Sequence, residues 1–576
     1  MRAWFVSKSQ APHWLHVLGV NPRKLLAALL VLALMGGLAV AGRHYYRSAR
    51  LEHLVRQAET FLKQKDARSA GLSARSALQL DPNHLAATRI MARLADEARN
   101  PAALLWHQRV VELGSNQTDD LLALANCALR ENELPVAEEA LLRVKPAQHQ
   151  TAAFHQTAGA FALTASRPDE AARHFAEAVR LDPRPLNQLN LAMVQLSSIN
   201  SAMQAHARTT LESLRTTRGC EALALRALFS DARRSSNASR AILFGRDLLA
   251  SAGAAFSDRV HVVDALAQFQ HADLENEIQR AKVSATHAGD LAELMFWLNA
   301  HGRARDTEAW FNELPPARRN EQPVPLAMAE ADVTLKQWPA LRARLAEADW
   351  QELNFMRHAF LARAAREEDD RFASSRWWRQ ALTAVGNGRQ PMAMLARQAQ
   401  KWRWDNEAEE LWWRLARGNA GQRPALAALH RLYSERRDAR NLLRVANRIL
   451  ELNPDDLVAR NNVAVLSLLL GENAARAHQL AQENFTRSPK NAAFVSTYAL
   501  SLHLQNKPAD AARLLEELPE SQLEHPSIAA LYGAILHAAG DQTKAGAYLA
   551  RADGNKALFP EEQMLVSTAL RQSARR

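Results

Sequence analysis

The chain is poor in the residues that build several common protein classes. Its 576 residues include only two cysteines, Cys127 and Cys220, which lie far apart in the sequence and form no CxxC motif or other metal-ligand spacing. We therefore interpret both thiols as buried small hydrophobic side chains. Glycine and proline number only 21 and 22, and strand-like runs of β-branched and aromatic residues are scarce. Because alanine, leucine, arginine and glutamate are abundant instead, we predict an all-α fold.

Catalytic signatures are also missing from the sequence. It contains no HExxH or GxSxG motif, no glycine-rich phosphate loop and no Cys/His cluster, and its 20 histidines are scattered. The sequence thus predicts no enzyme, with no catalytic residues, no metal site and no cofactor.

Acidic residues are absent from positions 1–50, which explains most of the formal net charge of +11. That segment holds seven basic residues: Arg2, Lys8, Arg23, Lys24, Arg43, Arg47 and Arg50. The rest of the chain keeps 65 of the 72 basic residues against 61 acidic ones, with both signs interspersed as on solvated helix faces. No basic stripe interleaved with aromatic residues is present, so we expect no nucleic-acid partner.

One long apolar run stands out at residues 25–42, LLAALLVLALMGGLAVAG. Its 18 uncharged residues would span roughly 27 Å as a helix, close to the thickness of a bilayer core. Basic residues on both sides and Tyr45 and Tyr46 after the run are typical of membrane interfaces. We predict a single-pass transmembrane helix that places the chain in an inner (cytoplasmic) membrane. A cleaved signal peptide, suggested by Ala39-Val40-Ala41, and a soluble core helix are the alternatives.

The orientation of this helix is nearly balanced, because basic residues flank both of its ends. The acid-free tail and the free amino terminus favour a cytoplasmic N-terminus. The remainder of the chain would then lie outside the cytoplasm, in the periplasm.

A sequence repeat with a period of about 34 residues runs through both ends of the chain. Ala70, Leu104, Ala137 and Ala171 follow one another at intervals of 34, 33 and 34, and Leu442, Ala477, Ala511 and Ala545 at intervals of 35, 34 and 34. In the best unit, Gly159 lies at position −12 relative to Ala171, and Phe175, Ala178 and Pro183 lie at +4, +7 and +12. Small residues let two helices of a hairpin approach closely, and proline ends the second helix.

The period and these residues resemble the tetratricopeptide-repeat family. The resemblance implies a right-handed solenoid of helical hairpins that binds other proteins and catalyses nothing. We therefore expect a membrane-tethered scaffold, in envelope or polysaccharide assembly because bacterial machineries of that kind commonly use such arrays. The expected divisions are a basic tail (1–24), the membrane helix (25–42), a first repeat block (50–184), degenerate repeats (185–423), and a second block with a capping helix (424–576).

Tryptophan is concentrated in the middle of the chain, with ten of the 13 between Trp297 and Trp413. We interpret most of them as packing between repeats, since the pairs Trp377-Trp378 and Trp412-Trp413 recur at about the repeat period. Trp402 and Trp404 fall near a turn and are the expected exceptions. A component that binds polysaccharide through this region is the alternative function, with glycan as its partner.

The resemblance also implies where a protein partner would bind. The first helix of each unit lines the binding groove in this family, and Arg89, Arg93, Asn126 and Gln156 come to neighbouring places on three such helices. Arg89 and Arg93 lie four apart and share one helix face. We predict that this polar strip binds an acidic peptide segment, the alternative being that the two arginines only solvate their helix.

Overall fold

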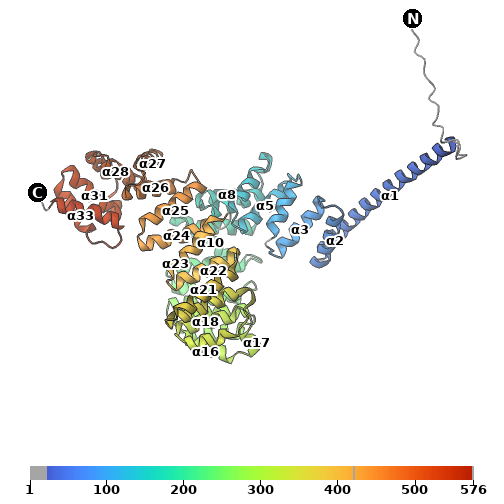
Figure 1. The fold of residues 1–576 in the computed structure, drawn as a ribbon, viewed down its shortest axis with the longest axis horizontal. Coiled ribbons are helices and arrows are strands. Elements are labelled where there is room, and N and C mark those ends of the chain that lie inside the picture. The colour runs from blue at the N-terminus through green and yellow to red at the C-terminus, as the bar shows by residue number, and fades with distance from the viewer. Residues whose placement is uncertain (1–21, 101, 419–421, 574–576) are drawn as a thin grey trace, which may run out of the picture. The chain divides into compact units, whose positions relative to one another are not determined.

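The structure is a computed structural model that describes residues 22–100, 102–418 and 422–573, with few side chains before residue 42. The predicted basic tail, residues 1–24, lies almost wholly outside this range. Every regular element of the described residues is a helix, and the helices follow one another as antiparallel pairs (Figure 1). The chain divides into two compact units, Met1–Thr286 and His287–Arg576.

The first unit consists of helical hairpins. Their helices are α1 (Pro22–Lys63) with α2 (Ala67–Leu80), α3 (Leu85–Glu97) with α4 (Ala103–Glu112), α5 (Thr118–Arg130) with α6 (Leu134–Leu142), α7 (Ala152–Thr164) with α8 (Pro168–Leu181), α9 (Pro185–Gln195) with α10 (Ser201–Leu214), α11 (Glu221–Arg234) with α12 (Ala238–Ala250), and α13 (Phe256–Gln268) with α14 (Leu274–Ser284).

The second unit repeats the arrangement. Its helices are α15 (Ala288–Ala300) with α16 (Ala304–Glu313), α18 (Val324–Thr334) with α19 (Trp338–Ala346), α20 (Asn354–Glu367) with α21 (Arg371–Val385), α22 (Arg389–Lys401) with α23 (Asp405–Arg417), α24 (Gln422–Arg436) with α25 (Ala439–Leu452), α26 (Leu457–Leu470) with α27 (Ala474–Arg487), α28 (Ala492–Leu504) with α29 (Pro508–Glu516), α31 (Pro526–Ala539) with α32 (Gln542–Ala552), and a last helix, α33 (Pro560–Ser573). Short helical turns, η2 (Pro146–Gln148), α17 (Pro316–Arg319), η3 (Gln351–Leu353) and α30 (Glu520–Leu523), lie between hairpins.

The described residues thus contain seven hairpins in the first unit and eight in the second. A period of about 34 residues predicts about 15 units between positions 51 and 553. The number of hairpins agrees with this prediction. The predicted all-α architecture of consecutive helical hairpins is confirmed.

One turn geometry recurs inside the hairpins. Lys336, Asp369, Arg403 and Arg437 each end a first helix with a positive φ between 52° and 60°. The next residue donates its N–H to a carbonyl five residues earlier, as from Asp438 to Tyr433 at 3.0 Å. This is the bond pattern of a Schellman motif, which satisfies the last carbonyls of a helix and reverses the chain. The four positions recur at intervals of 33, 34 and 34, so the turns follow the sequence period.

The contact between the two helices of a hairpin depends on small residues. Ala70, Ala137 and Ala171 are fully buried. A methyl group on Gly159 would lie 2.8 Å from a ring carbon of Phe175, too close for a real contact. In α4 the buried residue is Ala103, which is 4% exposed, whereas Leu104 is only half-buried. The register of the first block therefore runs through Ala103 in place of Leu104, one position earlier than predicted at this unit.

The same buried position continues through the later part of the predicted degenerate region. Thr307, Leu341, Ser374 and Ala408 each occupy the fourth residue of a second helix and are at most 6% exposed. They recur at intervals of 34, 33 and 34, and Leu442 continues the series at the next interval of 34. Since threonine, leucine and serine fill this position as well as alanine, the period is regular in the structure where the sequence match is weak.

Helix α1 runs without a break from Pro22 to Lys63, so the apolar run at 25–42 and the first helix of the first hairpin are one helix. Val55 and Ala58 near its end are buried against the neighbouring helices. Among the helices in the described part of the chain, none has the combined length and apolar character needed to span a bilayer. The predicted transmembrane helix therefore finds no support in the structure.

Candidate functional site

The first predicted binding residue, Arg89 on α3, is held within the fold. Its guanidinium donates to both carboxylate oxygens of Asp120 on α5, with Nε to Oδ1 at 3.1 Å, Nε to Oδ2 at 2.9 Å and Nη2 to Oδ2 at 2.6 Å. Nη2 also donates to Ser115 Oγ and to Gln117 Oε1, at 3.1 and 2.9 Å. The Asp120 side chain is only 16% exposed. The charge of Arg89 is therefore neutralised by the next hairpin.

Of the other three predicted residues, two are also held by the next hairpin and one is not. Asn126 donates to Thr157 Oγ1 at 3.2 Å, and Gln156 donates to Asn187 Oδ1. Arg93 differs, because among the described residues its ion pair is with Glu97 on its own helix, and both side chains are more than half exposed. Of the four, Arg93 thus offers the most accessible charge.

A polar ladder between consecutive first helices explains these contacts. Arg89 with Asp120, Asn126 with Thr157 and Gln156 with Asn187 are each separated by 31 residues. Arg226 with Asp258 continues the ladder at 32 residues, with two bonds of 2.7 Å. Three of the four residues of the predicted strip consequently lie where neighbouring repeats are joined, and Arg93 does not. Its role in partner binding stays a prediction.

Replacing Arg89 with alanine should lower the free energy of unfolding by roughly 2 kcal/mol, because the half-buried Asp120 carboxylate loses its partner. Arg93→Ala removes only an exposed pair on one helix and should cost less than about 0.5 kcal/mol. Urea unfolding followed by helical circular dichroism measures both. Equal losses would show that the Arg89 pair does not join the two hairpins. Arg93 is for this reason the better position for a charge reversal that tests peptide binding.

The tryptophans of the second unit are packing residues. Trp297, Trp310, Trp350, Trp402, Trp404, Trp412 and Trp413 are buried, and Trp338, Trp377 and Trp378 are partly buried against the same core or next to it. Trp402 and Trp404, the expected exceptions, are 9% and 4% exposed. That expectation was wrong, because the turn that carries them folds inward and brings the two rings together at a centroid distance of 5.2 Å.

Arginine side chains cover these rings. The guanidinium of Arg366 lies 3.9 Å from the centroid of Trp404, and that of Arg363 lies within 6.0 Å of Trp338, Trp402 and Trp404. Such cation–π contacts add to the packing. An aromatic platform open to a sugar ring is not formed by these buried rings.

The acidic run at residues 367–370 begins with the last residue of α20, Glu367, and continues through the turn to α21. Asp370 accepts the backbone N–H of Ala373 at 2.8 Å and so caps α21. Glu367 pairs with Arg363 at 2.8 Å. Glu368 pairs with Arg342 at 3.3 Å. These carboxylates therefore serve a cap and two ion pairs and do not converge on one point.

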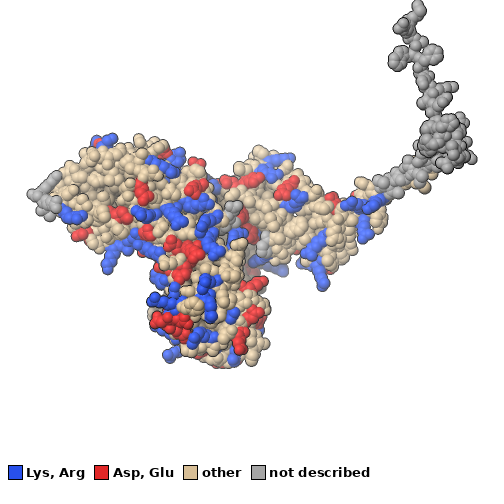
Figure 2. All heavy atoms as spheres, in the orientation of Figure 1, with Lys and Arg blue, Asp and Glu red and all other residues tan. Residues whose placement is uncertain are grey.

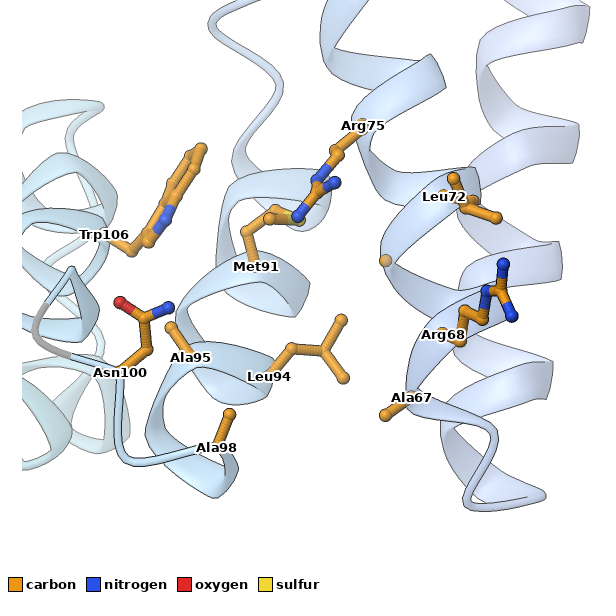
Figure 3. A pocket seen from close by; sticks show the side chains of 11 residues that line it. Ala67, Arg68, Leu72, Arg75, Met91, Leu94, Ala95, Ala98, Asn100 and Trp106 are labelled. Carbon is orange, nitrogen blue, oxygen red and sulfur yellow. The ribbon is translucent and has the colours of Figure 1, made fainter. Parts of the chain in front are cut away.

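Two grooves among the described residues could receive a partner. One, of about 490 Å³, lies between α2 and the α3–α4 hairpin and is drawn in Figure 3. Leu72, Met91, Leu94 and Trp106 line it, with Arg68 and Arg75 along the α2 side. Leu72 is 57% exposed, so this groove is a shallow and open apolar surface.

The second groove, of about 390 Å³, crosses three consecutive first helices. Its lining residues are Leu468 and Leu469 of α26, Leu500, His503 and Leu504 of α28, Ala534, His537 and Ala538 of α31, and Glu561, Met564, Leu565, Thr568, Ala569 and Gln572 of α33. Burial lowers the pKa of His503, which keeps its imidazole neutral near pH 7. Its Nδ1 is buried and has no hydrogen-bond partner among the described residues.

A cluster that the sequence did not indicate lies in the first unit. His107 Nε2 is 2.8 Å from Asp96 Oδ2, Arg130 holds the other oxygen of Asp96, and the Cys127 thiol lies beside them. Burial and the nearby Asp96 raise the pKa of Cys127 to about 11, so the thiol is protonated at neutral pH and is a poor nucleophile. The three residues come from three helices at spacings of 11 and 20, and no local motif could have revealed them.

Comparisons with known proteins found matches among solved structures. No protein-family model and no curated protein matches the chain. Among solved structures, PilF of Pseudomonas aeruginosa matches 39% of this chain and 98% of its own, with 17% identity and a TM-score of 0.31. A chain of the APC/C hetero-tetramer Cut9–Hcn1 matches over 79% of this chain and 97% of its own length, with 12% identity and a TM-score of 0.27. The TPR domain of P58(IPK) matches over 91% of this chain and 99% of its own length, with 12% identity and a TM-score of 0.22.

Because all three TM-scores lie below 0.5, the class of this protein rests on its own hairpins. Paired helices, a register of about 34 residues and small residues at the helix contact give the chain the architecture of a tetratricopeptide-repeat protein. Charged residues of both signs lie side by side over the face drawn in Figure 2, as expected for solvated repeat surfaces.

Proposed function

We propose that this protein is a scaffold that holds segments of other proteins and catalyses no reaction. The main support for this proposal is the groove across α26, α28 and α31. Its apolar lining includes Leu504, 44% exposed, and Met564, 65% exposed. Apolar grooves between helices accept the apolar face of a partner helix or peptide.

One polar atom in this groove supports a defined ligand chemistry. His503 lines the groove, and its imidazole can form one hydrogen bond to a ligand through the ring nitrogen opposite the buried Nδ1. We infer that the ligand is an amphipathic helical segment with a polar group placed to reach His503.

Peptide selection against the full-length protein tests this proposal. Leu504→Glu should weaken binding of a selected peptide at least ten-fold, because it puts a carboxylate into the apolar groove. The control is Leu452→Glu, since Leu452 on α25 is 42% exposed and lies outside the groove. Equal affinities of the two variants would place the binding site elsewhere.

We further propose that the scaffold is tethered to the inner membrane, with its repeats outside the cytoplasm, and serves envelope or polysaccharide assembly. The uncharged run at 25–42 supports the tether, and its continuity with the first repeat helix would hold the repeats close to the bilayer.

The tether has its own test in the native host. The full chain should remain with membranes through an alkaline carbonate wash, and a variant lacking residues 25–42 should be released. Release of the intact chain, or a mature N-terminus at Gly42, would contradict the tether and leave the scaffold proposal standing.

A further inference from the structure

Three potential metal ligands converge between the second and third hairpins. Asp96 is near the end of α3, His107 is on α4 and Cys127 is on α5. Their donor atoms, a carboxylate oxygen, an imidazole nitrogen and a thiol sulfur, all lie within 4.8 Å of one another. Cys127 and His107 are 1% and 7% exposed, and Asp96 is half-buried. The site is therefore enclosed by protein and reached from the Asp96 side.

This setting is unusual for a cysteine that only fills space. The other cysteine, Cys220, is buried in an apolar cluster with Leu225 and Phe229, as expected for a small hydrophobic side chain. Cys127 instead adjoins a carboxylate and an imidazole. A packing role accounts for the burial of its sulfur, and the Asp96–His107 pair beside it supplies two further donor atoms at the same place.

The donor set selects one class of ion. Zinc takes cysteine sulfur, histidine nitrogen and aspartate oxygen, whereas magnesium and calcium take oxygen ligands. Tetrahedral coordination at about 2.0–2.3 Å requires the donors to be roughly 3.3–3.8 Å apart. The His107–Asp96 pair, at 2.8 Å, thus needs to open slightly, and donors as far apart as 4.8 Å need to close by about 1 Å. Rotation about the side-chain bonds can supply both movements.

The surroundings also suit a metal ligand. Arg130 holds the second oxygen of Asp96, and such an outer hydrogen bond fixes the orientation of a ligating carboxylate. Three protein ligands leave a fourth position for water on the half-buried Asp96 side.

We propose that Asp96, His107 and Cys127 form a zinc site that clamps the second hairpin to the third. Binding replaces the S–H bond of Cys127 with a metal–sulfur bond and releases that proton to solvent. The ion binds the folded arrangement only, so it stabilises the first unit by mass action.

The test uses the reduced, metal-free, full-length protein with Co²⁺ and Zn²⁺ as the only added ligands. Added Co²⁺ should produce a thiolate-to-cobalt charge-transfer band that saturates at one equivalent of metal. The other histidines cannot produce this band because they have no sulfur. Cys127→Ala should abolish the band and Cys220→Ala should retain it. Zn²⁺ should raise the unfolding midpoint of the wild type and of Cys220→Ala, and leave that of Cys127→Ala unchanged.

A second variant covers the case in which Cys127→Ala does not fold. Asp96→Asn keeps the thiol and the side-chain volume, and it should weaken Co²⁺ binding at least ten-fold. Absence of the band in the folded wild type at excess Co²⁺ overturns the proposal. A band that survives Cys127→Ala, or that Asp96→Asn leaves unchanged in affinity, overturns it equally.

Discussion

Replacing Ala171 with glutamate is expected to lower the free energy of unfolding of the first unit by about 3 kcal/mol or more. Ala171 is fully buried in α8 and belongs to an apolar cluster with Ala162, Phe175 and Val194. No polar group of that cluster could pair with the carboxylate. Because each repeat is supported by its neighbours, the damage should extend to the adjoining hairpins.

Ala176→Glu supplies the matched control, because it makes the same substitution in the same helix. Ala176 is exposed, and a glutamate there can face Arg180 one turn later, so the change should stay within about 0.5 kcal/mol. Urea unfolding followed by helical circular dichroism compares the variants. Similar shifts for both would mean that the repeating register of small residues does not define the helix contact.

The second large effect is expected for Arg344→Met in the second unit. Arg344 donates to both oxygens of Asp332, at 3.0 and 3.2 Å, and the Asp332 side chain is fully buried. Methionine keeps the apolar stem of the side chain but leaves the buried carboxylate unpaired. We expect a loss of about 3 kcal/mol near neutral pH.

This loss should depend on pH in a defined direction. Burial raises the pKa of Asp332, and Arg344 opposes that rise. A carboxyl group whose folded pKa is raised contributes stability that is present at low pH and lost as pH rises through the folded pKa. Without Arg344 the folded pKa rises further, so Arg344→Met should cost more at about pH 8 than at about pH 5.

The double variant Arg344→Met with Asp332→Asn isolates the cause. A neutral amide of the same shape removes the buried charge. The double variant should therefore regain most of the lost stability, and its stability should no longer show the pH dependence of Arg344→Met. Tryptophan fluorescence during urea unfolding reports on this unit, which holds the buried tryptophans. A double variant as unstable as Arg344→Met at both pH values would contradict the role of the carboxylate.

The repeat could be predicted from the sequence because its steric requirement is local. Only small residues fit where Gly159 meets Phe175, or at Gly533, where an added methyl group would lie 3.0 Å from the backbone nitrogen of Leu549. Such positions therefore repeat visibly along the chain. Where threonine, leucine or serine is accepted, as at Thr307, Leu341 and Ser374, the pattern fades although the geometry continues.

Features that depend on two repeats could not be predicted from one sequence. The partner of Arg89 is 31 residues away, and its identity decides whether the charge is available to a ligand. Trp402 and Trp404 follow a helix end, which suggested exposure, but the packing of α20 and α23 encloses them. The Asp96, His107 and Cys127 cluster likewise requires three helices to be placed before its donors meet.

The groove in the second unit likewise depends on tertiary structure. Its floor comes from α26, α28 and α31, which are one repeat apart, and α33 supplies the remaining wall. The sequence located these helices, but the exposed apolar side chains at their shared surface become evident only when the helices pack.

Hydrogen exchange of the full-length protein, with and without a selected peptide, tests the scaffold proposal most directly. The proposal predicts added protection along α26, α28, α31 and α33, with Leu504→Glu abolishing it and Leu452→Glu preserving it. Added protection confined to other helices, or none at peptide concentrations that saturate binding, would contradict it.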